Sequence, residues 1–142
     1  MLADTAQLAA MIGEVPIFKG LDRKTLNSVV TGGKERIFNA GDLIVGEGGS
    51  GIGLYVILDG KAEVRKGAKV LATLAKGQFF GEMSVIDGQP RSADVAAVAK
   101  TRCWALTAWN FTGLVKAHPD IALAMLKEMV RRFRASQSTP TS

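Results

Sequence analysis

The residues best suited to chemistry lie in one short segment, residues 79–93, with the sequence FFGEMSVIDGQPRSA. Gly81 lets a bound group approach the backbone closely, and the five residues after it can form one helical turn. The first N–H groups of such a turn are unpaired and carry partial positive charge, which suits a phosphate. Pro90 makes the backbone before Arg91 rigid, and the planar guanidinium of Arg91 can hold two phosphate oxygens at once. The spacing therefore predicts an anion site.

Glu82 would repel a phosphate, so its presence in this segment is explained only if the ligand has a second group that a carboxylate can bind. A carboxylate accepts hydrogen bonds from hydroxyls, and a ribose supplies such hydroxyls. Glu82 and Arg91 would then recognise the two halves of one sugar phosphate. The alternative is an ordinary surface ion pair in a turn, because Gly, Glu and Arg often occur together in turns.

Catalytic and metal-ligating groups are scarce along the chain. The single cysteine, Cys103, and the single histidine, His118, exclude an internal disulfide and a Cys/His zinc site. One histidine at this position cannot build a Ser/His/Asp or Cys/His catalytic arrangement. We therefore expect no enzyme, no metal and no cofactor, and we interpret Cys103 as a small buried apolar residue.

Residues 1–33 are expected to form N-terminal helices. Apolar residues at helical spacing continue until Pro16, which breaks the pattern. Asp22 can cap a second helix, and Gly32 can close it.

Residues 35–107 consist of short runs of β-forming residues separated by glycine turns. Asp59-Gly60 between two such runs is a strong hairpin signal, because Gly tolerates the positive φ of a tight turn. Many short strands at close spacing favour an antiparallel barrel over a parallel sheet. The expected strands are 35–38, 43–45, 54–58, 62–65, 70–74, 93–98 and 103–106.

Residues 108–135 are expected to form two helices, and residues 136–142 a frayed polar tail. Thr107 or Asn110 can cap the first helix, and Pro119 fits the first turn of the second. An apolar residue recurs at every fourth position of the second helix, at Ile121, Met125, Met129 and Phe133. We predict a single domain, residues 1–142, of the α+β class and mainly β: an antiparallel β-roll or jelly-roll barrel between N-terminal and C-terminal helices.

Residues 80–93 resemble the phosphate-binding cassette of the cyclic nucleotide-binding domain family. That family includes catabolite activator proteins, protein kinase A regulatory subunits and cyclic-nucleotide-gated channels. The resemblance covers nearly the whole chain, with further similar segments at residues 15–21, 40–44, 47–48, 54–60 and 111–120. It implies a cassette at residues 79–93, hinge and lid helices at residues 108–135, and cAMP or cGMP as the ligand.

The resemblance also implies individual roles. Arg91 would pair with the cyclic phosphate, Glu82 would accept from the ribose 2′-hydroxyl, and Val64 would pack on the purine. The cassette residues expected at the ligand are Gly81, Glu82, Met83, Ser84, Arg91, Ser92 and Ala93. The expected lid residues are Met129, Arg132, Phe133 and Ser136, although Met129 and Phe133 are equally well explained as core residues of an amphipathic helix.

Ser92 departs from the pattern, because several cAMP receptors of the family have alanine after the arginine. Its hydroxyl can bond to the phosphate or to a syn guanine, so cGMP stays open as a ligand beside cAMP. The loop at residues 48–53 also lacks the acidic residue that is usual there.

The net charge of +5 favours anionic partners, but no DNA-reading motif accompanies it. The chain has no apolar run long enough to span a membrane and no secretory signal, which predicts a cytoplasmic location. We expect a non-catalytic receptor whose C-terminal helix closes over the nucleotide and signals to a protein partner or through self-association. The alternative is an interaction protein of the same fold that does not depend on nucleotide binding.

Overall fold

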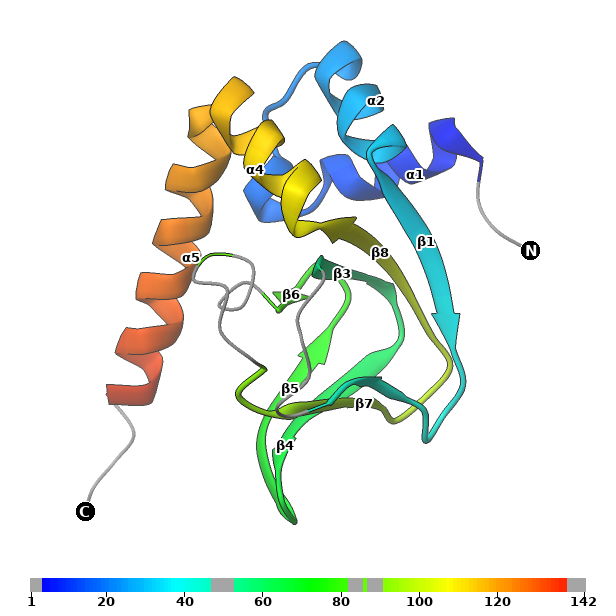
Figure 1. Cartoon of the computed structure of the whole chain (residues 1–142), viewed down its shortest axis with the longest axis vertical. Coiled ribbons are helices and arrows are strands. Elements are labelled where there is room, and N and C mark those ends of the chain that lie inside the picture. Colours follow the sequence, from blue (N-terminus) through cyan, green and yellow to red (C-terminus); the bar gives the residue numbers. More distant parts are fainter. Residues whose placement is uncertain (1–3, 47–52, 82–85, 87–90, 138–142) are drawn as a thin grey trace.

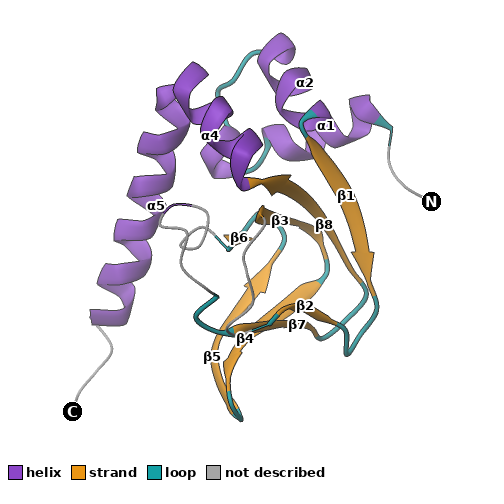
Figure 2. Ribbon diagram, in the orientation of Figure 1, coloured by secondary structure: helices purple, strands orange, loops and turns teal. Residues whose placement is uncertain are grey.

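A computed structural model describes residues 4–46, 53–81, 86 and 91–137 of the chain. Two antiparallel sheets face each other as a roll, and the helices gather at one end and along one side of it (Figures 1 and 2). The predicted class, α+β and mainly β with antiparallel strands, is confirmed. No described helix is both long and apolar enough to cross a membrane.

Each sheet has four strands. The first has the order β1 (Gly33–Phe38), β8 (Thr101–Thr107), β3 (Gly53–Asp59) and β6 (Phe79–Phe80). The second has the order β2 (Leu43–Val45), β7 (Asp94–Ala97), β4 (Lys61–Lys66) and β5 (Lys69–Ala75). Seven of these strands coincide with predicted ones to within two residues at each end, whereas β6 was not predicted.

The turn at Asp59-Gly60 does not form the predicted hairpin. β3 pairs with β6 and β8, while β4 pairs with β5 and β7, so this turn carries the chain from one sheet to the other. Gly60 does have the expected positive φ, 104°. A side chain there would begin 2.6 Å from the Cα of Thr101, so the turn is closely packed as well. Turn residues indicate where the chain reverses, but packing of the two faces decides which strands pair.

The helices are α1 (Thr5–Gly13), the 3₁₀-helix η1 (Pro16–Phe18), α2 (Arg23–Thr31), α4 (Ala108–Ala117) and α5 (Pro119–Gln137). Three of them, α2, α4 and α5, begin where Asp22, Thr107 and Pro119 predict. Asp22 accepts a 2.8 Å hydrogen bond from the backbone N–H of Thr25 at the start of α2. Thr107, rather than Asn110, caps α4. The last helix extends to Gln137, two residues into the expected tail.

Two apolar clusters hold this framework together. The larger one joins the helices to the first sheet around Trp104, which is fully buried and meets the Phe18 ring edge-on at 5.9 Å. The smaller one fills the roll and contains Tyr55, whose ring stacks on that of Phe80 at 5.1 Å. Ile121 and Met125 anchor the first half of α5 in the larger cluster, and its second half runs past β6 (Figure 1).

Candidate functional site

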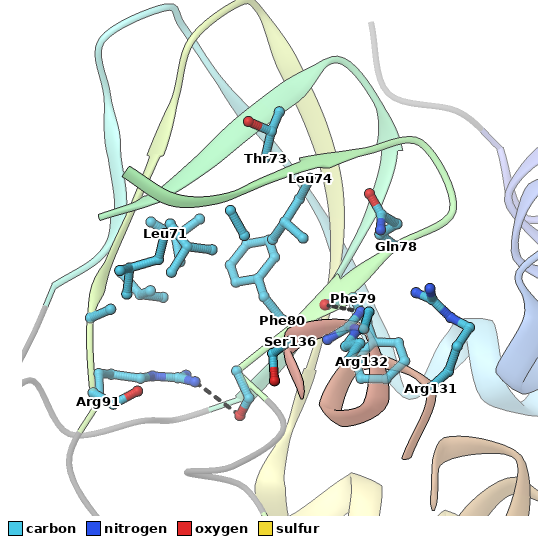
Figure 3. A pocket seen from close by; sticks show the side chains of 18 residues that line it. Leu71, Thr73, Leu74, Gln78, Phe79, Phe80, Arg91, Arg131, Arg132 and Ser136 are labelled. Atoms are coloured by element: carbon cyan, nitrogen blue, oxygen red, sulfur yellow. Dashed lines mark hydrogen bonds between the residues drawn. The ribbon is translucent and has the colours of Figure 1, made fainter. Parts of the chain in front are cut away.

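A cavity of about 520 Å³ opens between the second sheet, β6 and the end of α5. This volume lies within the range of small-molecule sites. Its walls are largely apolar, with Leu71, Leu74 and Phe80 among the residues that line them. Figure 3 shows Arg91 on one side of the cavity, and Arg131 and Arg132 on the other.

Arg91 is the buried cation of this cavity, with only 6% of its surface exposed. Its Nη1 donates to the carbonyl of Gly81 at 3.0 Å, and its Nη2 donates to the carbonyl of Gly53 at 2.7 Å. Gly53 begins β3 in the first sheet, whereas the backbone after Arg91 leads into β7 of the second. The guanidinium is therefore held in place where the two sheets meet.

Gly81 is required by both its backbone and its surroundings. Its φ of +88° lies in the left-handed region that side chains disfavour. A Cβ there would lie 2.8 Å from the carbonyl oxygen of Gly53 and would collide with the Arg91 guanidinium. Sequence reasoning expected a close approach at Gly81, and the group that approaches is Arg91 itself.

Arg132 connects α5 to the cavity wall. Its Nη2 donates to the carbonyl of Phe79 at 2.9 Å, and its guanidinium carbon lies 4.2 Å from the centre of the Phe79 ring. This combines a hydrogen bond with a cation–π contact. The last turns of α5 are thus attached to β6 beside the cavity.

Glu128 holds two arginines at this end of the site. It accepts hydrogen bonds from Arg131 at 2.8 and 2.7 Å, and one from Nε of Arg132 at 2.9 Å. The hydrogen bonds from Arg131, together with the one from Arg132, lower the pKa of Glu128 from 4.5 to about 2. The carboxylate therefore stays charged and orients both guanidinium groups.

The structure brings many of the predicted ligand residues to this one cavity. Those that line it are Val64, Gly81, Arg91, Ser92, Ala93, Arg132 and Ser136. Glu82, Met83 and Ser84 lie outside the described residues.

Met129 and Phe133 do not line the cavity. Met129 packs against the larger apolar cluster, and Phe133 is 63% exposed. A helix has 3.6 residues per turn, so a spacing of four residues rotates by about 40° at each step. The series that starts at buried Ile121 has therefore turned away from the core by Phe133.

Sequence reasoning missed part of the cavity wall. Phe79 and Phe80 lie in the predicted cassette but were not named as ligand residues, and the other additional lining residues are Val45, Leu71, Ala72, Thr73, Leu74, Gln78, Val95, Arg131 and Ala135. The sequence did contain a signal for Arg131 and Ala135. They directly precede the predicted lid residues Arg132 and Ser136, and like them they are four residues apart, so they lie one above the other on the helix. The sequence contained no such signal for the lining residues on β5, because the pattern of a strand does not show how its sheet curves over a cavity.

Cys103 has a structural environment rather than a reactive one. Cys103 is fully buried, and burial raises the pKa of its thiol to about 12, which confirms the interpretation as a small apolar residue. In the described part of the chain no three His, Cys, Asp or Glu side chains are grouped closely enough to hold a metal ion.

Comparison with known proteins identifies the family. The sequence profile of the cyclic nucleotide-binding domain matches residues 35–118, more than half of the chain. The chain belongs to this family. The resemblance predicted from residues 80–93 is therefore confirmed.

Several relatives share this domain. A cyclic nucleotide-gated potassium channel of Rhizobium etli is 33% identical over 122 residues, which are 86% of this chain and 34% of the channel. The crystal structure of the Thermus thermophilus catabolite activator protein superposes with a TM-score of 0.78 at 30% identity, covering 86% of this chain and 60% of that one. The regulatory domain of Toxoplasma gondii PKA, co-crystallised with cAMP, has a TM-score of 0.72 at 28% identity, covering 82% of this chain and 47% of that one. The chain thus spans about a third of the channel that it matches.

Proposed function

We propose that this domain is a non-catalytic receptor for a cyclic nucleotide, with cAMP as its ligand. The observation that carries the proposal is Arg91, a buried cation anchored at the wall of a largely apolar cavity. The planar guanidinium of Arg91 can hold two oxygens of one phosphate. The Toxoplasma gondii relative was crystallised with cAMP, which supports the same ligand class.

The other parts of the nucleotide have matching partners in this proposal. Glu82 accepts from the ribose 2′-hydroxyl, and Met83, Ser84, Ser92 and Ala93 surround the sugar phosphate. The purine packs on Val64 and the apolar wall beside it. Such a wall suits a purine ring, because burying apolar surface is favourable at roughly 25 cal/mol per Å².

We further propose that α5 is the lid, and that its movement signals to a partner protein. Arg132 and Ser136 on α5 line the cavity, so a bound nucleotide can contact this helix directly. A ligand shifts a conformational equilibrium only by its difference in affinity for the two states. A nucleotide that contacts Arg132 and Ser136 favours the state in which α5 lies against it.

Thermal unfolding with cAMP, cGMP or AMP tests the ligand. A nucleotide that binds only the folded protein raises its melting temperature. At a nucleotide concentration of a hundred times Kd, the free energy of unfolding increases by about 2.7 kcal/mol. We expect cAMP to raise it clearly and AMP hardly at all. The cGMP arm measures the selectivity of the domain between the two cyclic nucleotides. No shift at millimolar cAMP would instead support an interaction domain that does not depend on nucleotide.

Arg132→Gln tests the lid, with Arg134→Gln as the matched control. Both residues are on α5, but Arg134 does not line the cavity. We expect weaker cAMP binding for Arg132→Gln alone, measured by calorimetry. Equal affinities of the two variants would contradict the role of α5 as a lid.

A further inference from the structure

One face of α5 is apolar and lies open. Its four large side chains are Leu123, Leu126, Val130 and Phe133, with exposed fractions of 51%, 57%, 45% and 63%. Their spacings of three, four and three residues are those of the a and d positions in a coiled coil. We call these four residues the outer stripe. α5 forms one margin of the molecule, beyond α4 and the roll (Figure 1).

The outer stripe is separate from the face that α5 turns to the rest of the domain. That inner face contains Ile121 and Met125, which are buried, and Arg132, which reaches the cavity. At about 100° per residue, the centres of the two faces are roughly 140° apart around the helix. α5 can therefore keep its contacts with the domain and still bind another helix along the outer stripe.

Positive charge follows one edge of the outer stripe. Lys127 and Arg134 take the e positions of the heptad, and both are exposed. Among the described residues neither side chain takes part in a hydrogen bond or an ion pair. Glu128, the nearby acidic residue, is occupied by Arg131 and Arg132. The opposite edge has no charge, because Ala122 and Met129 take the g positions.

We propose that the outer stripe docks an amphipathic helix of a partner protein, with acidic residues facing Lys127 and Arg134. The inference rests on the proposed output through α5 and names the chemistry of the partner. Apolar residues of that helix cover the outer stripe, and its acidic residues lie opposite the charged edge. Interhelical pairs at the e and g positions set partner choice in such assemblies.

A second copy of this chain fits the outer stripe less well. In a parallel pair, e positions face g positions, so Lys127 and Arg134 would meet the uncharged Ala122 and Met129. In an antiparallel pair, e positions face each other, and Lys127 and Arg134 would repel their own copies. An acidic partner gains attraction where a second copy gains none.

Two labelled synthetic peptides test the charge preference by fluorescence anisotropy without nucleotide. Each has about three heptads with Leu at a and d; one carries Glu and the other Lys at e and g. We expect the acidic peptide to bind about tenfold more tightly at low salt, which two exposed ion pairs can supply. Lys127→Glu combined with Arg134→Glu should reverse the order. Equal binding of the two peptides, or none, overturns the proposal.

Leu126→Ser tests the outer stripe itself, with Val70→Ser on β5 as the matched control. Val70 is similarly exposed, at 47%, but lies on another element and outside the cavity lining. We expect the acidic peptide to bind about tenfold more weakly to Leu126→Ser, and unchanged to Val70→Ser. Circular dichroism confirms that both variants are folded. If sedimentation instead shows a dimer of the unmodified protein that Leu126→Ser disperses, the occupant is a second copy and the proposal is wrong.

Because no nucleotide is present, these results stand apart from the ligand test. Failure of peptide binding with normal cAMP binding would remove only the docking surface. Failure of cAMP binding with normal peptide binding would remove only the proposed receptor function.

Discussion

Replacing Arg91 by alanine removes the only buried cation that the described structure places at the cavity. The change deletes the group proposed to hold the cyclic phosphate. It also deletes two internal hydrogen bonds, those to the carbonyls of Gly81 and Gly53. Binding and stability should therefore both fall, and the two losses can be measured separately.

The size of each loss follows from the contacts of Arg91. A hydrogen-bonded contact to a charged group contributes about 1.5–3 kcal/mol, which corresponds to a ten- to hundredfold weaker Kd for cAMP. The two internal hydrogen bonds also have a charged donor, so at about 1.5 kcal/mol each they predict a loss of about 3 kcal/mol in the free energy of unfolding. Calorimetric titration measures the first, and urea unfolding without nucleotide measures the second.

One further variant separates the charge of Arg91 from its geometry, and a second serves as the control. Arg91→Lys keeps the charge but loses the planar fork, so its cAMP affinity should lie between those of the unmodified protein and Arg91→Ala. Arg36→Ala on β1 removes an exposed arginine outside the cavity lining and should leave the affinity unchanged. If folded Arg91→Ala binds cAMP as tightly as the unmodified protein, the assignment of the phosphate site is wrong.

Three other predictions concern the framework around the site. Gly81→Ala should lower the free energy of unfolding, measured with urea, by about 1–3 kcal/mol or more, because φ at this position is +88° and the new Cβ would meet Arg91. The control is Gly113→Ala in the open middle of α4, which should be neutral or stabilising in the same experiment. The depressed pKa of Glu128 contributes stability above its ordinary value of 4.5 that is lost as the pH falls towards about 2, so thermal melts of Glu128→Gln and the unmodified protein should converge over this range. Asp22→Ala should cost about 1 kcal/mol in urea unfolding through the lost cap of α2, whereas Asp22→Asn should retain most of it.

Local signals in the sequence predicted local structure well. Asp22 and Thr107 cap helices, and Pro119 begins one, because each effect depends on residues within a single turn. Strand positions followed from short β-forming runs between glycines. The two-residue strand β6 escaped prediction because it is too short to show alternation.

Long-range pairing was beyond such signals. The turn at Asp59-Gly60 has the conformation that its residues predict, yet its flanking strands belong to different sheets. The fourfold apolar series on α5 divides between the core at Ile121 and solvent at Phe133, because the helix rotates relative to that spacing. The strand pairing cannot be read from neighbouring residues, whereas the rotation along α5 follows from the helical repeat alone.

The candidate site also combines features that local sequence predicts with features that depend on long-range packing. By itself the sequence determined the family, since the residue types and spacing of residues 79–93, with Arg91 among them, are those of its phosphate-binding cassette. Only the tertiary structure decided that Arg91 is anchored to Gly53, 38 residues away along the chain, and that Arg132 from α5 reaches the same cavity through Phe79. The physical reason is that chemical type belongs to each residue, whereas burial and contact arise when distant segments pack together.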